Sequence, residues 1–165
     1  MKLLTALVLV IVIVAGGTLG WYYYNTRILS VQNGSGACSD PSGSRNHVYN
    51  PSRLQLVRSC VTVSGIVTST PRQEPDGDYH VWLGLDSTNA SLANNPSVHN
   101  GDLVVEIVCA LPITQQDAVQ ACQNYTNHIT IPQYGQHVTV SGPYVLDTLH
   151  NWYEVHPVFA LIVSQ

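Results

Sequence analysis

The chain has 165 residues and carries six lysines and arginines against ten aspartates and glutamates, a formal net charge of −4. Lys2 is its only lysine, so the sequence lacks the basic surface that binds nucleic-acid phosphates, and nucleic acid is disfavoured as a partner. Once an apolar N-terminal segment is set aside, the length suffices for one domain of roughly 100 to 120 residues with its own core.

Residues 1–24 are predicted to form a transmembrane anchor. The segment is apolar from Leu3 onward, ends in aromatic side chains at residues 21–24 and meets no charge before Arg27. As a helix it would span the roughly 30 Å of a bilayer's hydrocarbon, and Lys2 favours an N-terminus in the cytoplasm. The alternative is a cleaved signal peptide. The domain is therefore expected to be membrane-anchored or secreted, and extracytoplasmic in both cases.

The cysteines and sequons agree with this location. The four cysteines include no C-x-x-C pair, which favours two disulfides over zinc ligands or buried thiols. Several pairings are possible, and we favour Cys109 with Cys122 and Cys38 with Cys60. Glycosylation sequons in predicted loops begin at Asn33, Asn89 and Asn124.

Residues 25–46 are rich in Gly, Ser, Asn and Asp, which predicts a flexible linker. Residues 47–165 instead contain short β-branched runs separated by Gly, Pro and Asn clusters, the pattern of a small all-β domain. Strands are expected over residues 56–70, 79–86, 102–109, 136–147 and 151–163. Before the fourth strand, Thr114 as N-cap with Asp117 three residues later predicts one short helix over residues 112–122.

Three strands, a helix and two more strands is the order of the OB-fold, a five-stranded Greek-key barrel. The string Val-Thr-Val-Ser-Gly occurs in the first and fourth strands and ends at Gly65 and Gly142, where such a barrel needs glycine for a strand to curl. In the second strand, Val81, Leu83 and Leu85 share one face, which we expect to point inward. A β-sandwich is the alternative.

Residues 74–77 read Glu-Pro-Asp-Gly between the first two strands. Proline presets φ and glycine accepts a positive φ, so a hairpin turn explains this stretch without a ligand role for Asp76. An EF-hand is excluded because Ser87 stands where the bidentate glutamate would be.

Two pairs of polar side chains could form a metal site. Asp78 and His80 share a face of the second strand, and Glu154 and His156 share a face of the last. If the two faces meet, two carboxylates and two imidazoles could hold zinc or another divalent ion. The alternative is that these residues are hydrogen-bonded groups on the outer wall of the barrel, with no cofactor.

Trp82 and Trp152 are predicted beside these pairs, and aromatic platforms in such barrels hold sugars or bases. The loop of residues 87–101 could instead cover them. No phosphate loop, nucleophile elbow or Cys/His pair is present, so no catalytic residue is predicted. The candidate ligand-binding residues are Asp78, His80, Trp82, Trp152, Glu154 and His156.

Residues 61–86, VTVSGIVTSTPRQEPDGDYHVWLGLD, are similar to the start of staphylococcal-nuclease-like domains. In that family an Asp-Gly-Asp-Thr turn after the first strand supplies calcium-binding carboxylates. Asp76 and Asp78 match its two acids, whereas Tyr79 replaces the threonine. The family's catalytic arginine and glutamate have no counterpart, and Glu106 lies in a different setting.

A closer resemblance covers almost all of residues 47–165. It is carried by the segments NPSRLQLVRSCVTVSGIV, EPDGDYHVWLGLD, HNGDLVVEIVCA, GQHVTVSGPYVLD and HNWYEVHP. Together they resemble a group of uncharacterised exported OB-fold-like proteins of archaea and bacteria. This resemblance implies a fold and a compartment and brings no activity.

The sequence thus predicts a membrane-anchored extracytoplasmic binding module, without catalysis, whose ligand is a glycan, a peptide or an envelope protein. A metal-dependent phosphodiesterase or nuclease-like hydrolase is the alternative among enzymes. A structural accessory subunit of a membrane complex is the third hypothesis.

Overall fold

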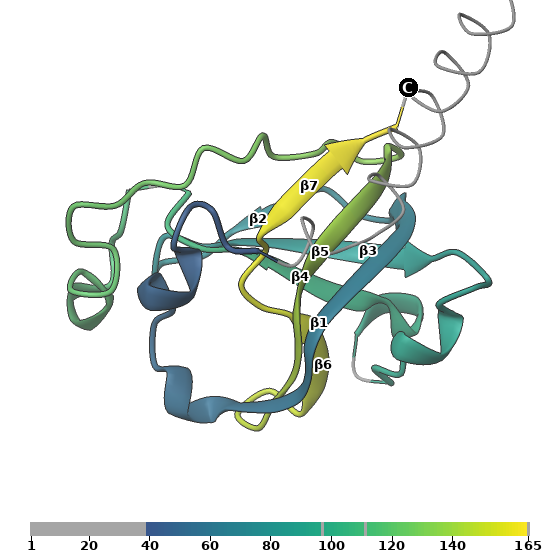
Figure 1. Ribbon diagram of the computed structural model, residues 1–165, viewed down its shortest axis with the longest axis horizontal. Coiled ribbons are helices and arrows are strands. Elements are labelled where there is room, and N and C mark those ends of the chain that lie inside the picture. Colours follow the sequence, from purple (N-terminus) through teal and green to yellow (C-terminus); the bar gives the residue numbers. More distant parts are fainter. Residues whose placement is uncertain (1–38, 97, 111, 165) are drawn as a thin grey trace, which may run out of the picture. The chain divides into compact units, whose positions relative to one another are not determined.

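The computed structural model describes residues 39–164 except 97 and 111, and they form a predominantly β unit (Figure 1). The strands are β1 (Leu54–Val67), β2 (Arg72–Gln73), β3 (Tyr79–Leu85), β4 (Leu103–Ile107), β5 (His137–Asp147), β6 (Trp152–Val155) and β7 (Ala160–Val163). Short 3-10 helices lie between them: η1 (Ser44–His47), η2 (Pro51–Arg53), η3 (Ala90–Leu92), η4 (His99–Gly101) and η5 (Gln116–Ala118). The mostly-β prediction is confirmed.

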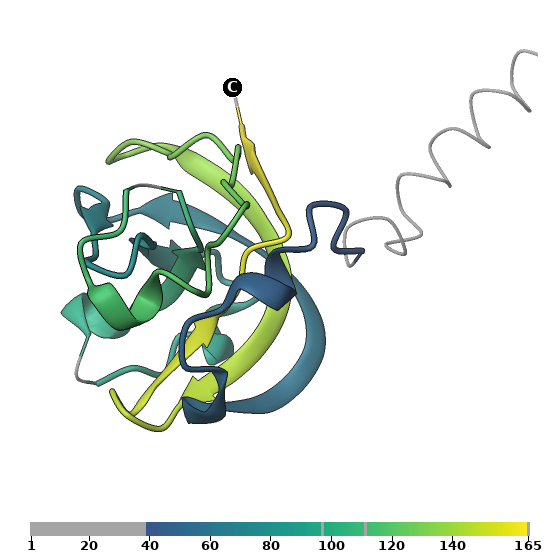
Figure 2. The ribbon, with the colours of Figure 1, turned by 90° about the vertical axis from the view of Figure 1, so that its left-hand side faces the viewer.

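The strands belong to one hydrogen-bonded sheet. β1 pairs antiparallel with both β3 and β5, while β3 pairs with β4, β4 pairs in parallel with β6, and β6 pairs with β5. The path of pairing through β3, β4, β6 and β5 therefore begins and ends on β1. β2 adds to β3, and β7 adds to β5. The two longest strands, β1 and β5, lie side by side and curve together (Figure 2).

The two Val-Thr-Val-Ser-Gly strings pair with each other, so that each glycine lies opposite the first valine of the other string. A Cβ atom on Gly65 would lie 2.3 Å from the carbonyl oxygen of Gly84, and one on Gly142 would lie 2.5 Å from that of Pro157. Any side chain at either position would collide with backbone. Glycine is required in both strands because another segment approaches closely there.

β3 separates two environments. Val81 and Leu83 are fully buried in the apolar core and Leu85 packs at its margin, as the alternation predicted. The buried core residues are Val61, Val63, Val67, Val81, Leu83, Leu92, Leu103, Val105, Ile107, Val138, Val140, Tyr144, Val155 and Val158. His80 and its cross-strand partner Glu106 lie on the opposite face of the sheet. That second face carries the candidate site.

Two predicted elements differ from the structure. The expected final strand over residues 151–163 is divided into β6 and β7, because Pro157 between them has no N–H to donate to a ladder. The expected helix over residues 112–122 is reduced to the single turn η5. Thr114 does not cap it: the N-cap is Gln115, which forms no side-chain cap bond, and the Thr114 hydroxyl donates to the carbonyl oxygen of Pro75 at 3.4 Å.

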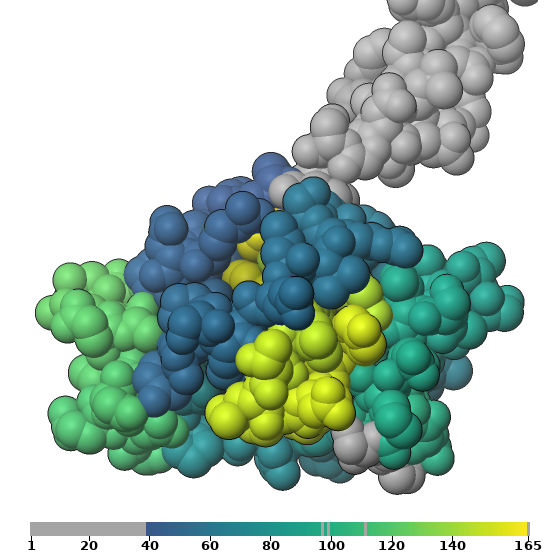
Figure 3. Space-filling model, turned by 90° about the horizontal axis from the view of Figure 1, so that it is seen from below, coloured from purple at the N-terminus to yellow at the C-terminus, as the bar shows by residue number. Residues whose placement is uncertain are grey.

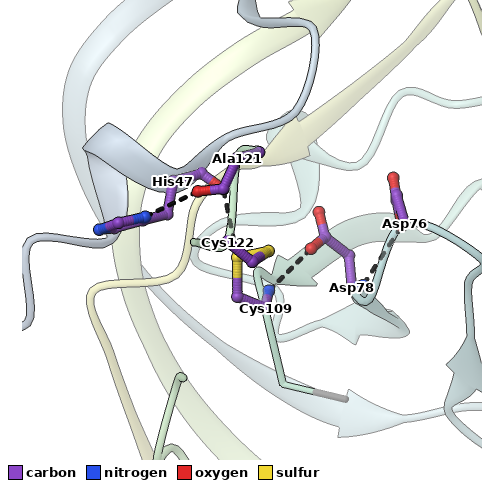
Figure 4. The surroundings of a disulfide bond; sticks show 6 residues. All are labelled: His47, Asp76, Asp78, Cys109, Ala121 and Cys122. Carbon is purple, nitrogen blue, oxygen red and sulfur yellow. Dashed lines mark hydrogen bonds between the residues drawn. A yellow bond between two sulfur atoms is a disulfide. The ribbon is translucent and has the colours of Figure 1, made fainter. Parts of the chain in front are cut away.

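The segment after β4 is held by a disulfide between Cys109 and Cys122, which confirms that predicted pair (Figure 4). Ser44, in η1, is buried; its N–H and its hydroxyl donate to Asp40 at 2.9 Å, and its hydroxyl also lies 3.4 Å from the carbonyl oxygen of Val158. Next to the disulfide, Nδ1 of His47 lies 2.7 Å from the carbonyl oxygen of Ala121 (Figure 4). The last part of the predicted linker thus packs on the β unit.

Within residues 39–164, as far as the structure describes them, no helix combines the length and apolarity needed to cross a membrane. The predicted anchor over residues 1–24 lies outside the described residues, as do Asn33 and Cys38. Of the other two sequons, Asn124 is exposed and Asn89 is half-buried.

Candidate functional site

Ionisable side chains gather on the face of β3, β4, β5 and β6 that points away from the apolar core. We call them the buried charged cluster: Arg53, Asp78, His80, Glu106, Asp147, Glu154 and His156. None of these side chains is more than 9% exposed. An unpaired charge at such depth costs several kcal/mol, so the members must compensate one another.

Strand register brings most of these residues together. His80 on β3 lies opposite Glu106 on β4, and Glu154 on β6 pairs with the residue two positions before Glu106. Asp78 precedes His80 by two residues and His156 follows Glu154 by two, so strand alternation directs all five side chains to the same face.

The other two members, Arg53 and Asp147, come from segments other than β3, β4 and β6. The Arg53 guanidinium forms an ion pair with the carboxylate of Asp147 at the end of β5. The carbonyl oxygen of Arg53 also accepts a hydrogen bond from the Thr148 N–H at 2.9 Å. Figure 3 shows the segment around η2 and the start of β1 (blue) against the residues near the end of β5 (yellow-green). This contact closes one side of the cluster.

Glu106 is the centre of the cluster. Its Oε1 lies 2.9 Å from Nε2 of His80, and its Oε2 lies 2.8 Å from Nδ1 of His156. Arg53 adds a third cation, with Nη2 3.8 Å from Oε2. Burial raises the pKa of Glu106, but the adjacent His156 and His80 outweigh burial and hold that pKa well below its usual value of 4.5. Glu106 is therefore ionised at neutral pH.

Glu154 shares His156 with Glu106. Its Oε1 lies 2.9 Å from Nδ1 of His156, and its Oε2 accepts a hydrogen bond from the indole N–H of Trp152 at 2.6 Å. Burial, followed by repulsion from Glu106, raises the pKa of Glu154 above its usual 4.5. The two buried glutamates are thus driven in opposite directions, and Glu154 retains a proton to higher pH.

The two histidines of the cluster are both held toward the charged form. Burial lowers the pKa of His156, but Glu106 and Glu154 outweigh it and raise that pKa to about 10. Burial also lowers the pKa of His80, and the contact with Glu106 outweighs it, so the net shift is upward. Among the described residues, Nδ1 of His80 and Nε2 of His156 are buried without a hydrogen-bond partner.

Asp78 lies at the far end of the cluster, next to the disulfide. Its Oδ1 accepts a hydrogen bond from the Cys109 N–H at 2.8 Å (Figure 4). Its Oδ2 is buried and has no hydrogen-bond partner in the described part of the chain. Burial, together with repulsion from Asp76 and Glu106, raises the pKa of Asp78 to about 7, although the charge of His156 opposes the shift.

Two groups of potential metal ligands lie around Asp78. Asp78, Glu106 and His156 each offer a ligand atom, and the three atoms lie within 4.8 Å of one another. The second group joins Asp78 to Cys109 and Cys122, whose sulfurs are already bonded to each other and are not thiolates. Only the first group retains its donor chemistry.

An open pocket of about 370 Å³ adjoins the cluster. It is lined by Tyr49, Asn50, Arg53, Arg72, Glu74, Pro75, Asp76, His80, Gln115, Leu149, His150 and Trp152. Arg53 and His80 therefore belong to both the pocket and the cluster. Oε1 of Glu74, on the pocket wall, lies 3.5 Å from Nδ1 of His80.

The tryptophans flank this pocket differently. Trp152 lines the pocket, stacks on His150 with ring centroids 4.5 Å apart, and meets the His80 ring edge-on at 6.0 Å. Trp82 meets His80 from another side at 6.1 Å, and the Arg72 guanidinium lies 5.5 Å from its ring centroid. Both indole rings are therefore edge-on to His80, and only that of Trp152 also lines the pocket.

No family model and no curated relative matches the chain. The chemistry of the site therefore rests on the geometry of its own residues. That geometry places the predicted residues together: Asp78, His80, Glu154 and His156 are members of the cluster, and Trp82 and Trp152 contact its edge.

Three members of the cluster were missed by sequence reasoning. Glu106 had a recognisable signal, since it is the only charged residue in the apolar run 103–109. Arg53 precedes the first strand and Asp147 ends the fourth, positions where charged residues are ordinary. Their sequence carried no comparable signal.

The Glu-Pro-Asp-Gly stretch forms the predicted turn. The Gly77 N–H donates to the carbonyl oxygen of Glu74 at 3.1 Å, and Gly77 has a φ of 94°. Asp76 accepts a hydrogen bond from the Asp78 N–H at 3.2 Å through Oδ1. Asp76 thus shapes the turn that presents Asp78 and does not belong to the group of potential ligands.

Proposed function

We propose that the chain is a membrane-anchored, extracytoplasmic binding module built on an OB-fold-like barrel. The strand pairing supports the barrel, because the path through β3, β4, β6 and β5 returns to β1 and its one parallel contact joins β4 to β6. The disulfide Cys109–Cys122 supports an oxidising compartment. The N-terminal apolar run supports a membrane anchor with a cytoplasmic N-terminus.

The pocket beside the cluster carries the binding proposal. Its volume falls in the range of small-ligand pockets, and its wall combines cationic and anionic groups with aromatic rings. Arg72 and His150 can donate hydrogen bonds, and Glu74 can accept them, while Trp152 and Leu149 offer apolar surface. A sugar unit needs this mixture, so a short glycan is the ligand we favour over a peptide or an envelope protein.

Substituting Arg72 with alanine should weaken ligand binding by about tenfold or more. Arg72 lines the pocket and forms an ion pair with Glu74 through Nε, and its side chain is 59% exposed. Its outer nitrogens can therefore donate to a ligand, and a charged hydrogen bond contributes about 1.5–3 kcal/mol. The full-length chain in mild detergent is screened against glycan and peptide arrays, and the best hit is titrated by calorimetry.

Arg58→Ala is the matched control, since Arg58 is exposed on β1 and does not line the pocket. It should leave the affinity unchanged. Equal losses in both variants, or no hit in either array, would remove the pocket as the binding site. A peptide as the sole hit would replace the glycan.

The anchor is tested separately. After expression in a host with an export pathway, the chain should remain in the membrane pellet after alkaline carbonate extraction, because an apolar helix of this length stays in the bilayer. Intact mass should show residues 1–24 still attached. Release into the supernatant with a shortened N-terminus would establish a cleaved signal peptide instead.

A further inference from the structure

We propose that Asp78, Glu106 and His156 form a binding site for one divalent transition-metal ion, for which Zn²⁺ is the natural probe. The proposal concerns the interior of the buried charged cluster and is independent of the ligand pocket. It goes beyond the proposed function, which concerns a glycan in the pocket, because it assigns a metal ion to the buried carboxylates.

Donor type and spacing are the first support. One imidazole nitrogen and two carboxylate oxygens lie within 4.8 Å of one another. Zinc binds such ligands at about 2.0–2.2 Å, so two atoms on one ion are separated by at most about 4.4 Å. A small inward movement would therefore bring all three atoms into one coordination sphere.

Unsatisfied buried atoms are the second and independent support. Oδ2 of Asp78 and Nε2 of His156 are buried and have no hydrogen-bond partner among the described residues, whereas the oxygens of Glu106 are ion-paired with the two imidazoles. Native proteins rarely leave such groups unpaired, and a cation bound between Asp78 and His156 beside the ionised Glu106 would satisfy both atoms.

Neighbouring residues form hydrogen bonds to the proposed ligands, and in known metal sites such bonds orient the side chains that bind the ion. Glu154 accepts from Nδ1 of His156, which leaves Nε2 without a protein partner. The Cys109 N–H fixes Oδ1 of Asp78 and leaves Oδ2 without one. A carboxylate behind a ligating histidine fixes its tautomer and orientation. Glu154 is thus a positioning residue in this proposal.

A chain of polar contacts joins the wall of the ligand pocket to Glu106. Glu74 on the pocket wall lies 3.5 Å from Nδ1 of His80, and Nε2 of His80 lies 2.9 Å from Glu106. His156 also lines a second pocket of about 230 Å³. Each pocket therefore has on its wall a side chain that belongs to the site or contacts Glu106.

The test measures Zn²⁺ binding to the full-length chain in mild detergent after EDTA treatment. Competition with a chromophoric chelator should give one ion per chain for the wild type. Asp78→Asn should lower the affinity by more than about 100-fold, because it removes a charged ligand, and Glu154→Gln by about 10- to 100-fold, because it loosens His156. Addition of Co²⁺ should produce visible d–d absorption without thiolate charge-transfer bands.

His137→Asn is the matched control, since His137 forms an exposed pair with Asp86 at 3.0 Å and lies outside the site. It should bind Zn²⁺ as the wild type does. The proposal is overturned if the wild type binds no ion, if Asp78→Asn binds as tightly as the wild type, or if His137→Asn loses the ion. Should a variant fail to fold, the Co²⁺ spectrum of the wild type decides, and absence of the bands overturns the site.

Discussion

Replacing Glu106 with glutamine should lower the free energy of unfolding by about 3–5 kcal/mol at pH 7 in the metal-free chain. The substitution keeps the shape of the side chain and removes its charge. His156 and Arg53 would then lose their central counter-charge while they remain buried. Removal of one partner from a buried ion pair is expensive because the other charge stays desolvated. Urea denaturation followed by circular dichroism should show a midpoint lower by more than about 1 M.

Asp86→Asn provides the comparison. Asp86 also pairs with a histidine, His137, but its side chain is 41% exposed and that of His137 is 39% exposed. An exposed pair of this kind contributes at most about 1 kcal/mol, so the control should unfold close to the wild type. A Glu106→Gln variant as stable as the Asp86→Asn variant would show that Glu106 does not compensate the buried cations.

The apolar face of β3 could be predicted from the sequence, whereas the arrangement of the charged face could not. Burial of Val81 and Leu83 follows from alternation alone, because period-two hydrophobicity defines a core face without knowledge of the partner strand. The turn at Gly77 is equally local. The division of the final strand at Pro157 was readable in principle, since a proline cannot donate to a ladder.

The candidate site needed information that is not local. His80 and Glu106 meet only because β3 and β4 are paired in one particular register. A shift by one residue would send Glu106 to the opposite face. Arg53 reaches Asp147 across an even longer separation in the chain. Side-chain type identified Asp78, His80, Glu154 and His156 as candidates, whereas the isolated charge of Glu106 in an apolar run could be assigned to the site only from the pairing of strands.

Replacing Asp78 with asparagine should have the opposite effect on stability from the Glu106 substitution. Burial, with Asp76 and Glu106 nearby, raises the pKa of Asp78 from 3.8 to about 7. Ionising Asp78 in the folded state at pH 8 therefore costs up to about 4 kcal/mol, which asparagine avoids. The amide oxygen of asparagine can still accept the hydrogen bond from Cys109. The metal-free variant should thus be more stable than the wild type at pH 8 by about 2–4 kcal/mol.

The difference in unfolding free energy between Asp78→Asn and the wild type should grow as the pH rises. Near pH 4 Asp78 is protonated in the folded state and about half protonated in the unfolded state, so the variant should be more stable by only about 0.4 kcal/mol. Between pH 4 and about 7 the unfolded carboxyl ionises while the folded one does not, and the wild type loses roughly 1.4 kcal/mol for each pH unit relative to the variant. Above pH 7 the difference should level off. Unfolding in urea at pH 5, 6, 7 and 8 with EDTA present measures this gap.

Asp117→Asn is the control of opposite sign, because the hydrogen bond from Tyr49 lowers the pKa of that exposed carboxyl. It should not stabilise the chain at any of these pH values. A constant difference between Asp78→Asn and the wild type from pH 5 to 8, or a less stable variant at pH 8, would mean that Asp78 is not a buried carboxyl held near neutrality. If the gap opens as expected, residue 78 is an aspartate despite its cost to folding. Selection for a ligand of that carboxylate then explains a residue that stability alone would replace with asparagine.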